Sequence, residues 1–337
     1  MRRLCCQLVG RLLQVSRVKL RKIAPHARLQ LGAPPLHFPT REVLVPRVDR
    51  LELAAINRNT RCLAFARYAL DRGYNVVATA RSVGKLKALA ARSTDRLLTQ
   101  ELDVTKPADA VQAVEAAIAR FGRIDVLINN AGYGIVGAAE ETPESQFRAQ
   151  METNFFGALS VIRAVLPHLR AQKSGAIVNV SSMGGQLSFS GAGAYSASKF
   201  ALEGMSEALA QEVDPLGIKV MILEPGAFRT KFNALQYMPV MEPYKDTVGS
   251  IRQMMQDMHG AQSGDPYKAA RAVDTALSAN KTPLRLQVGS DSVAAVCGHS
   301  EHLLKELAAW EKVAAHTRVE EAAVEVVWEK LGVTHAA

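Results

Sequence analysis

Cysteines are few in this sequence, and long apolar runs are missing from it. Four cysteines stand among its 337 residues, too few for a disulfide framework and without the spacing of a zinc site. We therefore expect a reducing compartment and no bound metal. A membrane-spanning helix needs about 18 consecutive apolar residues, and no stretch approaches that length. The sequence thus predicts a globular protein that does not span a membrane.

Acidic residues are missing from the first 40 positions, which hold eight basic residues. Residues 1–62 carry 13 Lys or Arg and three Asp or Glu, a net charge of +10, whereas the whole chain carries +9. The remainder is therefore nearly neutral, with a net charge of −1. Because the positive charge is confined to the N-terminal part, the basic pI is no argument for a nucleic-acid partner, and we expect none.

The basic segment over residues 1–40 has three interpretations. It is rich in Arg and poor in acidic residues, as mitochondrial presequences are. A disordered basic arm has a similar composition. The third interpretation is that a wrong start or reading frame has placed foreign sequence before the protein. We predict a disordered extension over residues 1–47 and a cytoplasmic location, with the mitochondrion as the alternative if the presequence is genuine.

Regular secondary structure begins near residue 63, where short apolar segments start to alternate with helical periodicity. The predicted strands span residues 75–80, 97–104, 125–130, 176–180, 219–223 and 284–288, and the predicted helices span residues 63–72, 85–92, 107–121, 143–170 and 195–213. Almost wholly apolar strands that alternate with helices indicate a parallel sheet covered on both faces. We therefore predict one doubly wound, Rossmann-like α/β domain over residues 48–290.

Two later segments depart from this alternation. Residues 232–264 hold five of the ten methionines, and such flexible apolar side chains suit a lid over an apolar substrate. A packed helical insertion is the alternative. Asp265 and Pro266 then predict the start of a helix. Residues 291–337 are predicted to be a helical extension, with two helical pieces over residues 301–330 whose Trp310 and Trp328 pack on the outside of the domain.

A serine, a tyrosine and a lysine are predicted to meet at one end of the sheet. The strand over residues 176–180 leads to Ser182, and the next helix carries Tyr195 and Lys199 four positions apart, hence on one face. An ammonium group beside a phenol favours the ionised phenol, so we expect a lowered pKa for Tyr195. The Tyr–Lys pair alone is weak evidence, because an exposed pair on an amphipathic helix has the same spacing.

Two further motifs accompany these three residues. The sequence N-N-A-G spans residues 129–132 and P-G-x-x-x-T spans residues 225–230, each after a predicted strand. With its motifs in this order, the chain closely resembles the short-chain dehydrogenase/reductase family over residues 63–289. The resemblance implies a Rossmann-like fold, an NAD(P) cofactor and oxidation or reduction at a CH–OH group.

The resemblance also implies the roles of four catalytic residues. Ser182 would hydrogen-bond the substrate oxygen, and Tyr195 would give that oxygen a proton in reduction or take one from it in oxidation. Lys199 would lower the pKa of the phenol and hold the nicotinamide ribose. Asn154, in the T-N-F-F-G segment of a predicted helix, would hold a water that completes the proton relay.

Cofactor contacts beyond those of Tyr195 and Lys199 are implied as well. The residues expected beside the adenosine are Asp103, Val104, Asn129, Ala131 and Gly132, and those expected beside the nicotinamide are Pro225, Gly226, Phe228 and Thr230. Ala80 stands where an NAD enzyme would usually offer a carboxylate, and Arg81 follows it. A guanidinium binds a 2′-phosphate well, so we predict NADP rather than NAD. A solvated Arg81 without this role is the alternative.

The glycine-rich phosphate loop of the family is missing. Its three glycines correspond here to Ile56, Thr60 and Cys62, whose side chains oppose close backbone approach to a pyrophosphate. Residues 48–54 also make a poor buried strand, with three charges in seven residues. Either the chain is a pseudoenzyme that lost the loop, or residues 1–62 are mistranslated sequence joined to a genuine enzyme body. The charge shift coincides with the motif loss, which favours the second explanation.

We therefore predict an NADP-dependent oxidoreductase that interconverts a secondary alcohol and a ketone or aldehyde, with an apolar small-molecule substrate. The alternative is a catalytically inactive relative that acts through protein contacts. In the family, the helices that correspond to residues 143–170 and 195–213 pair subunits, so we expect a homodimer or homotetramer. Binding of NADP(H) distinguishes the two functions.

Overall fold

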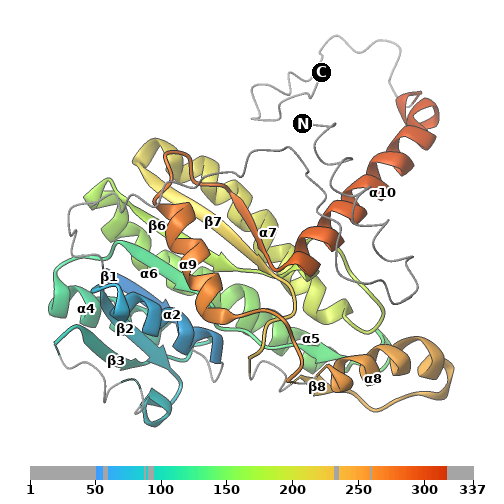
Figure 1. Ribbon diagram of the computed structural model, residues 1–337, viewed down its shortest axis with the longest axis horizontal. Helices are drawn as coiled ribbons and strands as arrows, with labels where there is room; N and C mark the ends of the chain where they lie inside the picture. Colours follow the sequence, from blue (N-terminus) through green and yellow to red (C-terminus); the bar gives the residue numbers. More distant parts are fainter. Residues whose placement is uncertain are drawn as a thin grey trace, which may run out of the picture. The chain divides into compact units, whose positions relative to one another are not determined.

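A seven-stranded sheet forms the middle of the fold in the computed structural model (Figure 1). In the order in which they lie side by side, its strands are β3 (Leu97–Glu101), β2 (Asn75–Ala80), β1 (Leu51–Ala55), β4 (Val126–Asn129), β6 (Gly175–Val180), β7 (Ile218–Pro225) and β9 (Arg285–Val288). Every neighbouring pair is parallel. The predicted doubly wound α/β fold is therefore confirmed.

The structure describes residues 51–55, 60–86, 89, 95–230, 235–258 and 260–316. Within these ranges, only the backbone is described for residues 51–55, 60–62 and 85. Three predictions fall outside the described residues: the extension over residues 1–47, the placement of Ile56, and the C-terminal helical piece with Trp328.

Helices cover both faces of the sheet (Figure 1). One face carries α2 (Thr60–Asp71) and α9 (Pro266–Leu277), and the other carries α4 (Pro107–Phe121), α6 (Gly157–Gln172) and α7 (Gly193–Val213). Val76 and Val77 lie in different cores, because neighbouring residues of a strand point to opposite faces. Burial on both faces is why the strands read as almost continuous apolar segments.

Strand β1 lies in the middle of the sheet, although the sequence indicates a poor buried strand there. Its backbone pairs with β2 on one side and with β4 on the other. The strand begins at Leu51, so of the three charged residues Asp49, Arg50 and Glu52 it contains only Glu52. Pairing on both sides supplies the backbone hydrogen bonds that the local sequence alone does not predict.

The long helix predicted over residues 143–170 is interrupted. The helix α5 (Glu144–Met151) passes into a π-helical turn, η2 (Glu152–Phe156), before α6 begins at Gly157. Such turns hold one extra residue per turn and are frequent at functional sites. Here the turn contains Asn154, whose side chain is buried.

Shorter elements connect these layers. They are η1 (Val83–Leu86), β5 (Ile135–Val136), η3 (Met183–Gly185), η4 (Asp214–Leu216), β8 (Gln236–Tyr237), η6 (Glu242–Tyr244), η7 (Lys245–Gly249) and α8 (Ser250–Asp257). β5 and β8 pair in parallel, which fastens the methionine-rich segment to the loop after β4. The predicted start of α9 is confirmed, because the Asp265 side chain accepts a hydrogen bond from the Tyr267 N–H at 2.9 Å.

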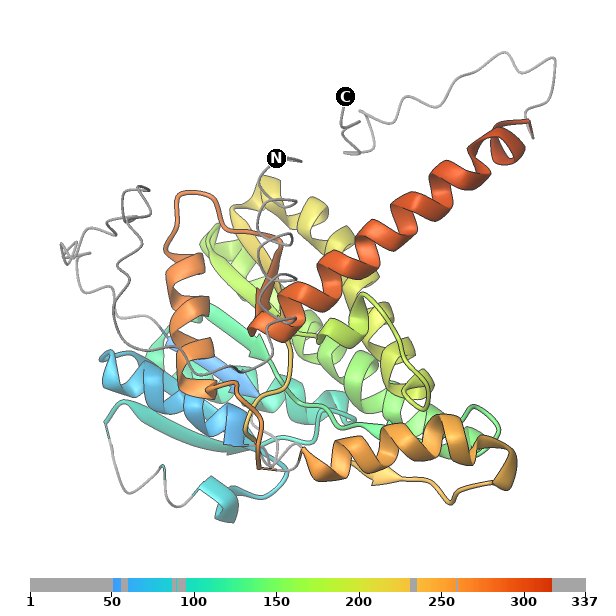
Figure 2. The same ribbon diagram turned by 45° about the vertical axis from the view of Figure 1, so that its right-hand side comes forward.

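The C-terminal extension begins as one helix, α10 (Ser290–Ala315), which starts before residue 301 and contains Trp310 of the first predicted helical piece. The second predicted piece lies outside the described residues. Figures 1 and 2 both show this helix running away from the sheet. Trp310 is 66% exposed, so the prediction that it packs on the domain was wrong. None of the helices in the described part of the chain combines the length and the apolar character that crossing a membrane requires.

Candidate active site

The predicted site residues follow the carboxyl ends of several strands. Ser182 comes two residues after β6, the N-N-A-G motif begins on the last residue of β4, and the P-G-x-x-x-T motif begins on the last residue of β7. Because all these strands are parallel, their carboxyl ends lie along one edge of the sheet. Ligands of open α/β sheets bind at that edge.

Ser182 and Tyr195 both lie beside the α-carbon of Gly184. The Ser182 Oγ accepts a hydrogen bond from the Gly184 N–H at 3.1 Å and so caps the 3₁₀ turn η3. A Cβ placed on Gly184 would lie 3.2 Å from Tyr195 Cε1 and 3.5 Å from Ser182 Oγ. The glycine therefore lets the serine hydroxyl and the phenol ring come together, as their spacing in the sequence predicts.

Lys199 is buried, and its ammonium group lies near the Tyr195 ring. Its Nζ donates a hydrogen bond to the Val180 carbonyl oxygen at 2.7 Å and lies 5.9 Å from the centre of the Tyr195 ring. Because Val180 is the last residue of β6, the strand that leads to Ser182 also holds the lysine. The ammonium group is thus fixed within the range at which a cation is attracted by an aromatic ring.

Asn154 ties three segments together from the π-helical turn. Its Nδ2 donates to the Tyr133 carbonyl oxygen at 3.0 Å and to Ser198 Oγ at 2.9 Å, and its Oδ1 accepts from the Tyr133 N–H at 3.0 Å. Ser198 Oγ in turn donates to the Tyr195 carbonyl oxygen at 2.7 Å. Both amide hydrogens are therefore bonded within the protein. The side chain positions the loop after β4 against α7, and the implied water-holding role stays a prediction.

Gly132 lies against this group. A Cβ on Gly132 would lie 3.1 Å from Asn154 Oδ1 and 3.6 Å from Lys199 Nζ. The backbone of the N-N-A-G loop therefore passes close to the lysine, at the place where the resemblance puts the cofactor. The residues present at this end of the site fit a dinucleotide, because a bare backbone stands beside a fixed ammonium group.

Three of the residues expected beside the adenosine have side chains that contact other parts of the protein. The Asn129 side chain donates to Asn179 Oδ1 at 2.9 Å, and Val104 is buried in a hydrophobic core. Ala131 packs against the same core. These three side chains are therefore engaged within the protein, which leaves only their backbone atoms for the predicted contact with the cofactor.

Asp103 and Arg81 form a charged corner beyond β2 and β3. Burial raises the pKa of the Asp103 carboxyl, but two hydrogen bonds from Thr105 and the nearby Arg81 and Lys106 hold that pKa below its usual range. Arg81 itself is exposed. An exposed guanidinium at the end of β2 is where the sequence predicts contact with a 2′-phosphate.

A pocket opens beside Ser182 and Tyr195. Pro225, Gly226, Phe228 and Thr230, the residues expected beside the nicotinamide, also line it. Its remaining walls are largely apolar and include Ile135, Val136, Met183, Phe189, Leu235, Met255 and Met258. The last three come from the methionine-rich segment predicted as a lid. Met183 and Phe189 were missed, because they stand in a loop without periodicity.

Gly226 has a structural explanation of its own. A Cβ at this position would collide with the carboxylate of Asp291, which accepts a hydrogen bond from the Ala227 N–H at 2.6 Å. Asp291 lies in the first turn of α10. The start of the C-terminal helix therefore fastens the loop that lines the pocket.

The position of the missing glycine loop is described only in part. α2 begins at Thr60, which places Thr60 and Cys62 on the helical backbone after β1. Among the described residues, no three His, Cys, Asp or Glu side chains are grouped as a metal site.

Comparison with known proteins agrees with this geometry. The family model for short chain dehydrogenases matches residues 62–237, beginning where the sequence pattern becomes regular. The chain is 43% identical to oxidoreductase BOA17 of Botryotinia fuckeliana (strain B05.10) over 234 residues, which are 68% of this chain and 85% of that protein. It is 39% identical to a 3-ketodihydrosphingosine reductase of Bacteroides thetaiotaomicron over 228 residues, which are 65% of this chain and 80% of that protein.

A solved structure gives the same result for the fold. A short-chain dehydrogenase from Streptomyces avermitilis superposes with a TM-score of 0.76 at 43% identity and covers 81% of this chain and 100% of its own. The family match extends over more than half of the sequence, and the identity to BOA17 covers most of that protein. The chain therefore belongs to the short-chain dehydrogenase/reductase family of NAD(P)-dependent oxidoreductases.

Proposed function

We propose that this chain interconverts a secondary alcohol and a ketone or aldehyde with NADP as cofactor. The observation that carries the proposal is that Ser182 and Tyr195 line one pocket while Lys199 is fixed behind the phenol. A hydroxyl, a phenol and an ammonium group arranged in this way support proton transfer at a substrate oxygen.

Each of the three side chains has a distinct role in this proposal. Ser182 Oγ accepts the Gly184 N–H, and its hydroxyl hydrogen is then donated to the substrate oxygen. Tyr195 gives a proton to that oxygen in reduction and takes one in oxidation. Lys199 favours the ionised phenol. The cofactor, when bound between the N-N-A-G loop and the pocket, supplies or accepts the hydride.

The walls of the pocket support an apolar substrate. Apart from Ser182, Tyr195, Thr230 and Gln262, its lining consists of glycine and apolar residues. Burial of apolar surface is the main favourable contribution to binding in such a pocket. A relative named 3-ketodihydrosphingosine reductase, whose name gives a keto compound, is consistent with a ketone as substrate.

The choice of NADP rests on Arg81. This guanidinium is exposed directly after β2, and Ala80 offers no carboxylate to a ribose hydroxyl. A charge-assisted contact with a 2′-phosphate would favour NADP over NAD.

Replacement of Tyr195 tests the proposal. Tyr195→Phe removes the phenolic proton and keeps the ring, so we expect NADPH-dependent carbonyl reduction to fall by at least about 10²-fold. Tyr267→Phe is the control, because that phenol bonds Asp71 and does not line the pocket. Turnover by Tyr195→Phe close to that of the parent protein would contradict the mechanism.

The second candidate is a relative without catalytic activity that acts through protein contacts. It is favoured by the bulky residues at the three positions where the family has glycine, Ile56, Thr60 and Cys62. Titration of NADPH fluorescence with the full chain distinguishes the two. Saturable binding, by the full chain or after residues 48–62 are replaced by an apolar strand followed by T-G-x-x-x-G-x-G, supports the oxidoreductase. Its absence from both proteins supports the inactive relative.

A further inference from the structure

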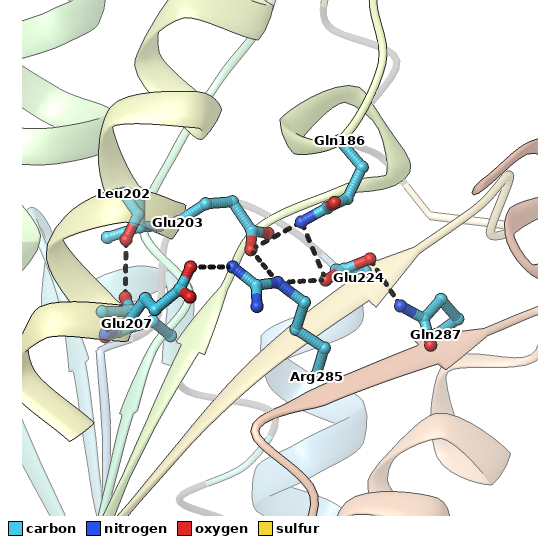
Figure 3. A network of polar contacts seen from close by, with 9 residues as sticks. Gln186, Leu202, Glu203, Glu207, Glu224, Arg285 and Gln287 are labelled. Atoms are coloured by element: carbon cyan, nitrogen blue, oxygen red, sulfur yellow. Dashed lines mark hydrogen bonds and ion pairs between the residues drawn. The ribbon is translucent and has the colours of Figure 1, made fainter. Parts of the chain in front are cut away.

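A buried polar cluster lies beside Gln186, which ends the turn η3 (Figure 3). It joins Glu203 of α7, Glu224 of β7 and Arg285 of β9. The exposed fraction is 4% for Glu203 and 0% for Glu224. Charged groups are rarely buried this deeply without a reason, because they lose their hydration.

The cluster contains more carboxyl groups than cations. Arg285 Nε lies 3.0 Å from Glu203 Oε2 and 3.6 Å from Glu224 Oε1, and its Nη2 lies 2.8 Å from the more exposed Glu207. Burial, together with the charge of Glu203, raises the pKa of Glu224 to about 7. Burial also raises the pKa of Glu203, although Ser181, Arg285 and Gln186 oppose the rise. The two carboxyl groups therefore titrate as a pair that retains a proton at acidic to neutral pH.

Gln186 connects the cluster to the catalytic turn. Its Nε2 donates to Glu203 Oε2 at 3.0 Å and reaches Glu224 Oε1 at 3.5 Å, as Figure 3 shows. Gln186 is also the C-terminal cap of η3, where its N–H donates to the Met183 carbonyl oxygen at 3.0 Å. The turn begins at Ser182 and ends at Gln186. A side chain that hydrogen-bonds Gln186 therefore restrains the end of the turn opposite the catalytic serine.

A second contact runs through Gly185. A Cβ at this position would collide with Ser181 Oγ and would lie 3.0 Å from Glu203 Cγ. The Gly185 backbone of the turn therefore packs directly against the Glu203 side chain. Ser181 Oγ and Glu203 Oε1 are both buried beside it and make no hydrogen bond of ordinary geometry, although the Ser181 hydroxyl lies close enough to lower the pKa of Glu203.

Helix α7 brings the catalytic lysine and this carboxyl group together. Lys199 and Glu203 are four residues apart, so they project from the same face of the helix. Lys199 bonds the end of β6 before Ser182, and Glu203 bonds Gln186 after the turn. One helix face therefore holds the segment around Ser182 on both sides.

We propose that Glu203 is a positioning residue that fixes the Ser182 hydroxyl by holding the turn Met183–Gly185 through Gln186 and the Gly185 backbone. The catalytic consequence of this positioning rests on the proposed function above. The positioning itself is a property of the folded chain and is measurable without cofactor.

Hydrogen–deuterium exchange of the full chain tests the positioning. The amides of Gly185, Gln186 and Leu187 are bonded within the turn. In Glu203→Ala and in Gln186→Ala we expect these amides to exchange at least about tenfold faster, because the turn opens more often. The control is Glu207→Gln, which removes another partner of Arg285 on the same helix without touching Gln186.

A kinetic readout accompanies the exchange measurement. In a chain that reduces a carbonyl substrate, both variants are expected to lower kcat by about 10- to 100-fold through misplacement of Ser182. Binding of NADPH should stay unchanged in both, and Glu207→Gln should keep the parent kcat. A variant that only loses stability would instead change amide exchange, kcat and NADPH binding together.

The outcomes separate this inference from the proposed function. Unchanged turn exchange in both Glu203→Ala and Gln186→Ala overturns the inference, and so does equal acceleration in Glu207→Gln. If Glu203→Ala does not fold, Gln186→Ala decides, because it removes only the partly buried side chain that joins the turn to the cluster. Carbonyl reduction that is absent from the parent chain refutes the proposed function, whereas the exchange result still decides whether Glu203 holds the turn.

Discussion

Lys199 shows how one side chain at the site depends on groups distant in the sequence. Its spacing from Tyr195 is local, but its hydrogen bond goes to the backbone of Val180, and a neighbouring bare backbone is supplied by Gly132. Asn154 has the same character, because all its side-chain bonds reach other elements. The function of each residue therefore requires the assembled edge of the sheet.

Arg81 makes a prediction about cofactor choice. In Arg81→Ala we expect the Kd for NADPH to rise by about 10- to 100-fold, the value of a lost charge-assisted hydrogen bond, while the Kd for NADH changes little. Fluorescence titration with each cofactor measures both constants. Arg96→Ala is a matched control, because this exposed arginine precedes β3 and so lies at the opposite edge of the sheet. An equal loss for both cofactors would make Arg81 an ordinary solvated residue.

Glu224 makes a prediction about pH. Its pKa in the folded chain is raised to about 7 from an ordinary 4.5, so the folded state binds the proton more tightly than the unfolded state does. The corresponding stability is fully present below pH 4.5 and is lost as the pH rises through 7. The free energy of unfolding should therefore fall between these values, with a slope of at most about 1.4 kcal/mol per pH unit from this group.

Glu224→Gln should flatten that slope, since the amide does not titrate. Urea unfolding of the parent protein and the variant at several pH values between 4.5 and 8 measures it. Glu207→Gln, which alters an exposed carboxylate beside the same arginine, should keep the parent slope. If parent and Glu224→Gln show parallel pH dependence, the buried carboxyl pair does not retain its proton.

At the scale of elements, the turn η2 and the strand β1 carry the main departures from local expectation. The π-helical turn places Asn154 inward at a point where an α-helix predicted from periodicity would continue. The β1 backbone pairs with both β2 and β4, although the local sequence has only a modest propensity to form a strand. In both places long-range contacts outweigh local preference, which is worth less than about 1 kcal/mol per residue.

The side chains at the three family glycine positions make a prediction about cofactor affinity. Each of them opposes the close approach of backbone to a pyrophosphate, so cofactor binding loses free energy. A total loss of about 4 kcal/mol weakens binding roughly 10³-fold. We therefore expect the full chain to bind NADPH poorly, and expect recovery when residues 48–62 are replaced by an apolar strand followed by T-G-x-x-x-G-x-G.

Fluorescence titration of NADPH measures both proteins. The matched control carries the same replacement with alanine at the three glycine positions, which separates the loop from the improved strand. Tight binding by the unaltered chain would show that the loop argument is wrong.

Among the described residues of the whole molecule, exposed apolar side chains include some on η2 and α7 and others on α10. Phe156 of η2 and Phe200 of α7 are each 45% exposed, on two elements that pack against each other. On α10, Leu304, Leu307 and Trp310 are more exposed still. Exposed apolar groups of this size commonly mark contacts between proteins.

We predict that the chain forms a homodimer through the surface around Phe156 and Phe200. Phe200→Glu should convert the dimer into a monomer, because an unpaired charge would be buried at the contact. Size-exclusion chromatography with light scattering measures the mass. Leu307→Glu on α10 is the comparison, and dissociation by that variant alone would place the interface on α10 instead.

Sequence patterns were sufficient to predict the alternation of strands and helices, the parallel sheet and the grouping of Ser182, Tyr195 and Lys199. These features follow from short-range periodicity and from the fact that parallel strands end at one edge. Apolar strand composition is sufficient for them, because both faces of the sheet are buried.

The residues that complete the site are brought together by long-range contacts, which local sequence patterns do not predict. Arg285 meets Glu203 across 82 positions of sequence, and Asn129 meets Asn179 across 50. Neither pair has a local signature, because the first pair joins β9 to α7 and the second joins the neighbouring strands β4 and β6. The pocket walls from Met183 and Phe189, and the exposure of Trp310, are likewise set by which surfaces remain after the sheet and its helices have packed.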